Sequence, residues 1–168
     1  AGFAPIAIGL ALTLIHLVRT YILSPYTDES VLLRFAFVPV RYTIPLADQD
    51  LAWLEEPIYP PDDHAGLARL RGVAPMPIAA GENCSNLMEF KRLMESGAIG
   101  IAQPSITKVG GVTEMRKVFA LGEAHGVTVV PHSPYFGPGL MASIHVCAAA
   151  TREIPIERYY CDFTESPF

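Results

Sequence analysis

The stretch PIAAGENCSNLMEFKRLMESGAIGIAQPS, residues 77–105, decides the fold. A short apolar run predicts a strand over residues 77–81, and a second predicts a strand over residues 99–103. The segment between them predicts a helix over residues 86–96, with Ser85 or Asn86 as N-cap and Gly97 just past its end. A helix of this length between two apolar strands is typical of a parallel α/β sheet.

The same alternation continues on both sides of this stretch. We predict further strands over residues 51–55, 127–131 and 156–160, and helices over residues 63–71, 113–125 and 139–151, the second closed by Gly126. The fold class is therefore α/β, as part of a (β/α)8 TIM-type barrel, roughly its strands 4 to 8. A complete barrel needs about 250 residues, and the sequence has 168.

The first 47 residues have a different character. Residues 1–18 contain no Lys, Arg, Asp or Glu. They favour one or two buried parallel strands, and a membrane span or signal segment is the alternative. Residues 31–46 hold Pro39 and Pro45, and no helical period survives there. We place a domain boundary at Asp48, with residues 1–47 an unassigned apolar segment and residues 48–168 the barrel portion.

The composition excludes several classes of function. A net charge of −5 gives no basic surface for nucleic acid or anionic membrane. With 51% hydrophobic and 17% charged residues, the chain is globular rather than disordered. Its three cysteines lack CxxC spacing, which favours a reducing, cytoplasmic setting over a disulfide framework.

Five polar residues recur at nearly regular intervals along the strand–helix pattern. They are Glu55, Glu82, Ser105, His132 and Glu157. Each except the last ends or directly follows a predicted strand. The carboxyl ends of the strands of a (β/α)8 barrel share one mouth, which carries the active site. The spacing therefore predicts one site built from distant residues.

The two acids Glu55 and Glu82 end neighbouring predicted strands. Two carboxylates at adjacent strand ends repel each other unless a cation lies between them. Their hard oxygen atoms suit Mg²⁺. Taken singly, Glu55 could be a surface acid beside Glu56, and Glu82 an acid favoured by a helix N-terminus. Taken together at matched strand ends, they favour a metal site.

The other polar positions are less specific. His132 suits a general base near neutral pH, or a hydrogen bond within its loop. Glu157 could donate a hydrogen bond to a substrate, or pair with Arg152 or Arg158. Lys108, before two glycines, resembles a tight turn more than a phosphate loop. Cys84 has no plausible base beside it, so we do not expect a nucleophile there.

Four motifs together carry a family resemblance. WLEEP, PIAAGEN, QPSITKVGGVTE and VVPHSPYFGPGL resemble the ends of the fourth to seventh barrel strands in the enolase superfamily. Specifically, they resemble the mandelate racemase and muconate lactonizing enzyme family. The resemblance runs from about Asp48 to the C-terminus, roughly the second half of the catalytic barrel. Each motif alone is weak, but four in this order are a strong signal.

The resemblance implies a reaction and a role for each residue. The family abstracts a proton next to a carboxylate and stabilises the resulting enediolate with Mg²⁺. Dehydration of a hydroxy acid or sugar acid is our first expectation, and racemisation or epimerisation the second. The roles implied are Glu55 and Glu82 as metal ligands, His132 as base, Glu157 as hydrogen-bonding acid, and Ser105 and Lys108 as substrate contacts.

Three departures from the family pattern stand in the sequence. The third metal ligand, an Asp in a D-x-N pattern, falls on Tyr21, and its partner on Leu23. The lysine pair of the second strand is absent, since no lysine precedes Lys91. Ser105 stands where the family's His–Asp dyads have an Asp, so we expect His132 to lack its usual orienting carboxylate.

These departures keep two other hypotheses open. One is a truncated, non-catalytic fragment whose open sheet edges favour a homo-oligomer, with an out-of-frame or unrelated first 45 residues. The other is a domain tethered to a membrane by residues 1–18, which we consider less plausible. The family's N-terminal capping domain, which selects the substrate, has no counterpart in the sequence, so the particular acid stays undetermined.

Overall fold

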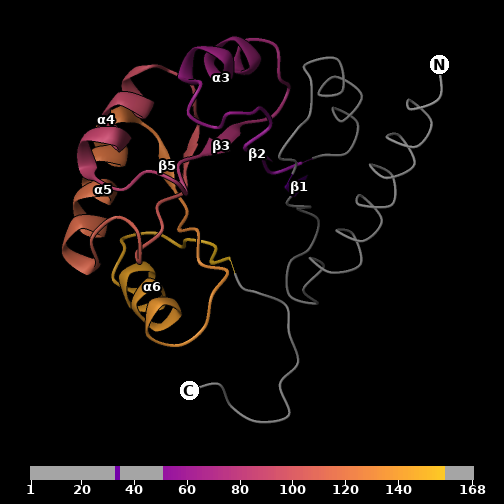
Figure 1. Cartoon of the computed structure of the whole chain (residues 1–168). Helices are drawn as coiled ribbons and strands as arrows, with labels where there is room; N and C mark the ends of the chain where they lie inside the picture. Colours follow the sequence, from indigo (N-terminus) through magenta and orange to yellow (C-terminus); the bar gives the residue numbers. More distant parts are fainter. Residues whose placement is uncertain (1–32, 35–50, 158–168) are drawn as a thin grey trace.

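The computed structural model describes residues 33–34 and 51–157, and every structural statement below concerns these residues (Figure 1). The strands are β1 (Leu33–Arg34), β2 (Leu54–Glu55), β3 (Ile78–Ala80), β4 (Ile101–Ala102) and β5 (Thr128–Val129). The helices are α3 (His64–Arg71), α4 (Leu87–Glu95), α5 (Val112–His125) and α6 (Pro138–Ala148).

The strands form one parallel sheet in the order β1-β2-β3-β4-β5. Leu54 lies opposite Ile78, Ala79 opposite Ile101 and Ala102 opposite Val129. Consecutive strands therefore pair directly, and from β2 to β5 each is joined to the next through a helix, as in a β/α barrel. Helices α4 and α5 lie on the left of the sheet in Figure 1, α3 lies at the top and α6 lies below.

Alternation along the strands separates two faces of the sheet. The helix-facing side holds the main core, in which Leu54, Ile78 and Phe90 are fully buried. Burying such a side chain contributes about 1.5–3 kcal/mol. The opposite face holds a smaller cluster made of Trp53, Ala79, Ile101 and Val130. Because side chains two residues apart share a face, Glu55 and Gln103 belong to this second face.

The ends of the helices follow from local sequence signals. Asn86 is the N-cap of α4, and its side-chain Oδ1 accepts a hydrogen bond from the backbone N of Glu89 at 3.1 Å. Gly126 ends α5 in the left-handed conformation, at φ 65°, which glycine adopts without steric cost. These caps fix where the chain leaves each helix and enters the next strand.

The amino edge of the sheet, where helices return to strands, is closed by hydrogen bonds. The Arg71 guanidinium at the end of α3 donates to the carbonyl of Gly97 at 2.8 Å and to that of Ile99 at 2.7 Å. The backbone N of Val127 donates to Gly122 at 2.8 Å. The Arg71 bonds therefore satisfy two carbonyl groups between α4 and β4, and the Val127 bond satisfies one that the end of α5 leaves unpaired.

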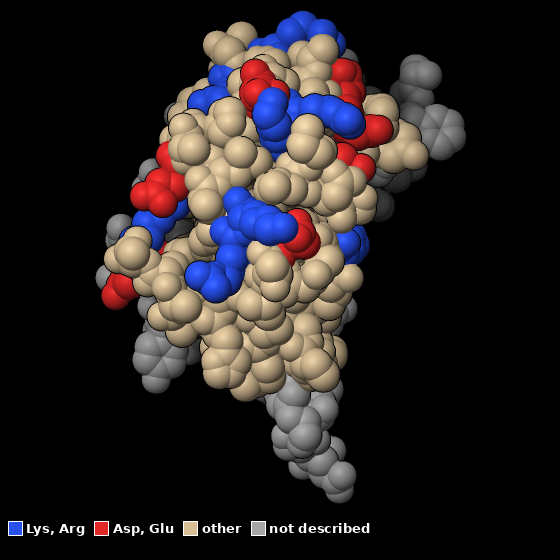
Figure 2. Space-filling view, turned by 90° about the vertical axis from the view of Figure 1, so that its left-hand side faces the viewer, with Lys and Arg blue, Asp and Glu red and all other residues tan. Residues whose placement is uncertain are grey.

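The outer surface carries both signs of charge. In Figure 2, Lys and Arg are interspersed with Asp and Glu over the upper part of this face, and the lower part, toward α6, is uncharged. Lys91 pairs with Glu95 on α4, and Lys117 pairs with Glu114 on α5. Within the described ranges, no helix is both long and apolar enough to cross a membrane.

Most of the predicted elements are confirmed, with shorter strands than predicted. β1 lies in a stretch where the sequence predicted no element. Ile156 and Glu157, which open the predicted last strand, are not in a strand. The rest of that strand, the predictions for residues 1–32, the boundary at Asp48, and Tyr21 and Leu23 with them, lie outside the described residues.

Candidate functional site

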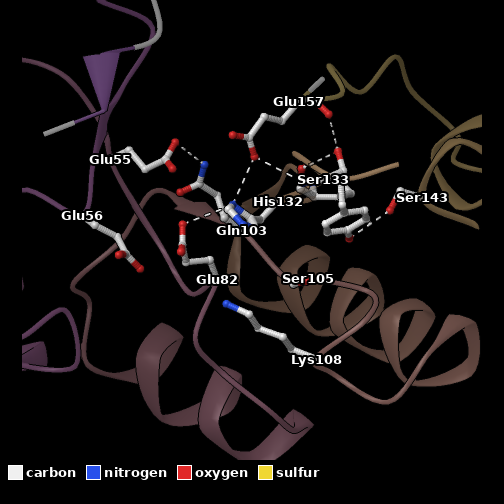
Figure 3. Close-up of polar contacts among 12 residues, drawn as sticks. Glu55, Glu56, Glu82, Gln103, Ser105, Lys108, His132, Ser133, Ser143 and Glu157 are labelled. Carbon is white, nitrogen blue, oxygen red and sulfur yellow. Dashed lines mark hydrogen bonds and ion pairs between the residues drawn. The ribbon is translucent and has the colours of Figure 1, made fainter. Parts of the chain in front are cut away.

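Polar side chains converge at the carboxyl edge of the sheet, as predicted (Figure 3). Glu55 is the last residue of β2, and Glu82 follows β3 after Gly81. His132 comes shortly after β5, beyond Pro131. Gly81 has φ 120°, and a Cβ there would lie 2.7 Å from Phe90, so glycine is required to lead the chain to Glu82.

Glu55 is buried, with 4% of its surface exposed. Its Oε2 accepts a hydrogen bond from Gln103 Nε2 at 2.7 Å and a longer one from Trp53 Nε1 at 3.4 Å. A surface acid, the alternative that the sequence left open, is therefore excluded. A buried carboxylate needs such donors or a cation to offset its desolvation.

His132 lies between two carboxylates. Its Nδ1 is 3.2 Å from Glu82 Oε2 and 3.2 Å from Glu157 Oε2. Both partners are acceptors when ionised, so Nδ1 carries a proton, and in a neutral ring the basic lone pair belongs to Nε2. The expectation that His132 lacks an orienting carboxylate is wrong. Its two carboxylate partners, Glu82 and Glu157, come from other segments of the chain than the one that carries Ser105.

Glu157 is held in place by the residue that follows His132. The backbone N of Ser133 donates to Glu157 Oε2 at 3.2 Å, and Ser133 Oγ donates to the Glu157 backbone carbonyl at 2.6 Å. These two bonds bind the segment after α6 to the loop after β5. They bring the last acid of the predicted series to the site although it is not in a strand.

The donor set fits a divalent cation. Glu55, His132 and Glu157 each offer one ligand atom, and these atoms lie within 4.8 Å of one another. Carboxylate oxygens are the ligands that Mg²⁺ prefers, and converging carboxylates favour a cation between them. This group differs from the predicted ligand pair, since Glu82 adjoins the site through its contact with His132 Nδ1.

The two predicted substrate contacts differ in exposure. Lys108 is exposed, and its Nζ donates to Asn83 Oδ1 at 3.2 Å. Ser105 is 1% exposed and shares a hydrogen bond of 3.0 Å with Thr107. Lys108 is thus able to meet a solute, and Ser105 supports its loop.

Cys84 is a poor nucleophile, as expected. Burial, followed by the negative charges of Glu89, Glu56 and Asp62, raises the pKa of its thiol from 9.0 to about 12. The thiolate is the reactive form of cysteine. At neutral pH the side chain is a protonated, inert thiol, although it lies in the loop that carries Glu82.

Sequence reasoning missed Gln103, Trp53 and Ser133. The first two contact Glu55 and the last contacts Glu157. A usable signal existed for Gln103, because it ends the strand predicted over residues 99–103. An uncharged amide alone does not indicate a catalytic or metal-binding role, so this signal did not predict Gln103 as a site residue.

Comparison with known proteins settles the family. The family model described as "Enolase C-terminal domain-like" matches residues 40–166. The chain belongs to this family. The resemblance to mandelate racemase and muconate lactonizing enzymes is thereby confirmed, and so is the assignment of the fold to part of an enolase-type barrel.

Similar proteins include sugar-acid dehydratases. The chain is 37% identical over 94 residues to a D-galactonate dehydratase of Ralstonia nicotianae. It is 38% identical over 94 residues to a D-galactonate dehydratase of Cronobacter sakazakii. Each match covers 56% of this enolase-family chain and 24% of the relative. The chain therefore spans about a quarter of the length of these curated relatives.

Solved structures agree with the fold. A mandelate racemase/muconate lactonizing protein from Paracoccus denitrificans complexed with magnesium matches with a TM-score of 0.65 and 32% identity, over 71% of this chain and 32% of that one. A racemase from Streptomyces coelicolor with bound magnesium matches with a TM-score of 0.62 and 32% identity, over 70% and 33%. Both were solved with magnesium, which agrees with a divalent cation as the group that fits this site.

Proposed function

We propose that this chain carries a large part of the catalytic site of a Mg²⁺-dependent sugar-acid dehydratase. The observation that supports it most directly is the convergence of Glu55, Glu82 and Glu157 around His132 at the carboxyl edge of the sheet. The D-galactonate dehydratases among the similar proteins support an acid sugar as the substrate class.

The resemblance to the family suggests a role for each residue. Glu55 and Glu82 would hold Mg²⁺, since Glu55 belongs to the group of ligand atoms that lie within 4.8 Å of one another and Glu82 adjoins that group through its contact with His132. When bound, Mg²⁺ supplies positive charge next to the substrate carboxylate, which acidifies the adjacent C–H bond. Glu157, as an ionised carboxylate, holds the His132 ring through Nδ1, and exposed Lys108 offers the substrate carboxylate a counter-charge from the mouth of the site.

His132 moves the proton. In the neutral ring, Nε2 takes the proton from the carbon next to the carboxylate, and the carboxylates at Nδ1 stabilise the imidazolium that forms. The hydroxyl on the neighbouring carbon then leaves, and the proton on Nε2 passes to it, so water departs. One base is sufficient for this sequence of steps.

Racemisation is the second candidate, favoured by the similarity to the racemase from Streptomyces coelicolor. It needs a second acid–base group on the other face of the same carbon. Ser105, which stands where a His–Asp dyad has its Asp, supplies no such group near neutral pH. We therefore rank dehydration first.

Titration of Mg²⁺ into the purified chain by calorimetry tests the proposal. We expect saturable binding that is lost in Glu55→Gln and in Glu82→Gln. Glu95→Gln is the matched control, since it neutralises an exposed acid paired with Lys91 on α4. A folded wild-type chain without Mg²⁺ binding contradicts the proposal and leaves a non-catalytic fragment.

Turnover is the second stage of the same test. Incubating the Mg²⁺-loaded chain with D-galactonate should release a 2-keto acid, and His132→Asn should lower the rate by about 10²–10⁴. In deuterated water, exchange at the carbon next to the carboxylate without a 2-keto product would favour the racemase alternative.

We also propose that the chain self-associates and resides in the cytoplasm. Within the described part of the sheet, β1 and β5 are the outermost strands, and open parallel edges favour pairing with another copy. Sedimentation velocity over a range of concentrations measures this, and a single monomeric species at all concentrations contradicts it.

A further inference from the structure

Gln103 is the most constrained polar side chain at the carboxyl edge that the proposed roles leave unused. It follows β4, and its backbone N donates to the Ala80 carbonyl at 3.0 Å. Only 2% of its surface is exposed. This hydrogen bond to the neighbouring strand fixes the backbone of Gln103. Because side chains two residues apart in a strand point to the same face, the Gln103 side chain lies on the face of the sheet that carries Glu55.

The orientation of the Gln103 amide is set by chemistry. The nearest charged group is the Glu55 carboxylate, whose Oε2 lies 2.7 Å from Gln103 Nε2. An ionised carboxylate only accepts hydrogen bonds. The amide nitrogen must therefore face Glu55, and Oε1 must point elsewhere. In Figure 3 the Gln103 oxygen is turned away from His132.

That amide oxygen is an unpaired acceptor. Gln103 Oε1 is buried and has no hydrogen-bond partner among the described residues. Leaving a buried acceptor unpaired costs about 1–3 kcal/mol. The neighbouring carboxylates of Glu55 and Glu82 have no proton to give when ionised. Since no described side chain donates to this oxygen, a ligand of the site is a candidate donor.

The two donors of Glu55 also have a directional effect. Gln103 Nε2 and Trp53 Nε1 both reach Oε2. Groups that hydrogen-bond a ligand carboxylate fix its orientation at the metal.

We propose that Gln103 is a positioning residue with two contacts: Nε2 orients the Glu55 carboxylate, and Oε1 accepts a hydrogen bond from an O–H group brought by the ligands of the site. The O–H group belongs either to a water molecule bound to the metal or to a hydroxyl of the polyhydroxy acid. The inference rests on the proposed function, because it requires a metal at Glu55.

Calorimetric titration of Mg²⁺ alone into Gln103→Leu tests the inference. The variant keeps the approximate volume and removes both contacts. We expect Mg²⁺ affinity to fall about 10–100-fold, as for other groups that support metal ligands. Urea unfolding without metal should change little, because the lost donor to Glu55 and the removed unpaired acceptor offset each other.

Trp53→Phe is the matched control, because it removes the longer of the two bonds to the same Glu55 oxygen. Its Mg²⁺ affinity should fall less than that of Gln103→Leu. Equal falls in the two variants overturn the role of Gln103 Oε1. Should Gln103→Leu fail to fold, Gln103→Met provides the same comparison with a more flexible side chain.

A second titration distinguishes the two sources of the O–H group. D-Galactonate is added to wild type and to Gln103→Leu, each saturated with Mg²⁺. A loss of D-galactonate affinity in the variant assigns the bond to a substrate hydroxyl, and unchanged D-galactonate affinity assigns it to metal-bound water.

The failure of this inference differs from the failure of the proposed function. Equal Mg²⁺ affinity in wild type and folded Gln103→Leu overturns the inference alone. A wild-type chain that does not bind Mg²⁺ overturns the proposed function and the inference with it.

Discussion

The two edges of the sheet differ in how their polar groups are paired among the described residues. At the amino edge, Arg71 donates to two carbonyl groups and Gly126 ends α5 in the conformation that glycine prefers. At the carboxyl edge, three acids crowd one imidazole and the amide oxygen of Gln103 is unpaired. Among the described residues, the polar groups named at the amino edge are paired, and the carboxyl edge keeps an acceptor without a donor. Barrels commonly divide stability and function in this way.

The largest expected effect concerns the reactivity of the Cys84 thiol, whose pKa is raised first by burial and then by neighbouring negative charges. Raising the thiol pKa from 9.0 to about 12 lowers the thiolate fraction at pH 8 by about 10³, since each pKa unit is a factor of ten. Alkylation by iodoacetamide should be slower by a similar factor in the folded chain than in urea. The double variant Cys147→Ala with Cys161→Ser leaves Cys84 as the sole thiol. Rapid alkylation of that folded variant would contradict the raised pKa of Cys84.

Next in size is a packing change at the amino edge. A Cβ at Gly122 would lie 2.5 Å from Val129 Cγ2 and 2.9 Å from the Val127 carbonyl oxygen. Gly122→Ala should therefore lower the free energy of unfolding by about 1–3 kcal/mol, although alanine favours helices. Chemical denaturation measures this, with exposed Glu123→Ala on the same helix as control, for which a change within about 0.5 kcal/mol is expected.

Arg71→Ala should have a somewhat smaller effect. It removes two hydrogen bonds to carbonyl groups and should cost about 1–2 kcal/mol of unfolding free energy. Arg69→Ala, which loses an exposed contact with Asp63 at 4.0 Å, should cost less than about 1 kcal/mol. Mg²⁺ affinity should stay at the wild-type value in both variants. A change in that affinity would show that the edges are not independent.

The smallest effect depends on pH. The hydrogen bond from the Ser85 backbone N lowers the pKa of Glu89 below 4.5. A lowered pKa in the folded state stabilises above pH 4.5, and this contribution disappears as the pH falls through the folded pKa. We expect Glu89→Gln to lose about 0.5 kcal/mol or less at pH 7 and nothing relative to wild type near pH 2. Urea unfolding at both pH values measures the difference.

Glu89→Gln also tests how much the charge of Glu89 contributes to the raised pKa of Cys84. Glu89 is the first charged group that raises the Cys84 pKa, after burial itself. Removing its charge should speed alkylation of Cys84 in the same variant. An unchanged alkylation rate would assign the raised pKa to burial alone.

The sequence predicted the local features well. Apolar runs and caps placed α4 and α5 within a residue or two, because Asn86 and Gly126 act on their own helix ends. β1 was missed because its two residues form a strand only by pairing with β2, which no local pattern encodes. The predicted boundary at Asp48 stays a prediction.

The sequence predicted which residues lie together at the candidate site, but not which of their side chains are in contact. The spacing of the strand ends predicted that Glu55, Glu82, His132 and Glu157 lie close together. It did not reveal that Glu82 and Glu157 share the Nδ1 of His132, because side-chain direction across strands is absent from a one-dimensional pattern. The catalytic, metal-binding and substrate-binding roles of these residues, and of Ser105 and Lys108, stay predictions.

The sequential strand order has a consequence for biosynthesis. Since each of the described strands pairs with the next described strand along the chain, none of them has to be inserted between two that are already joined. A nascent polypeptide can add one strand–helix unit at a time as it leaves the ribosome. Of the site residues, Glu55 and Glu82 are made before His132, and Glu157 can contact the His132 ring only after α6 has been made. The described strands can therefore pair before this contact forms.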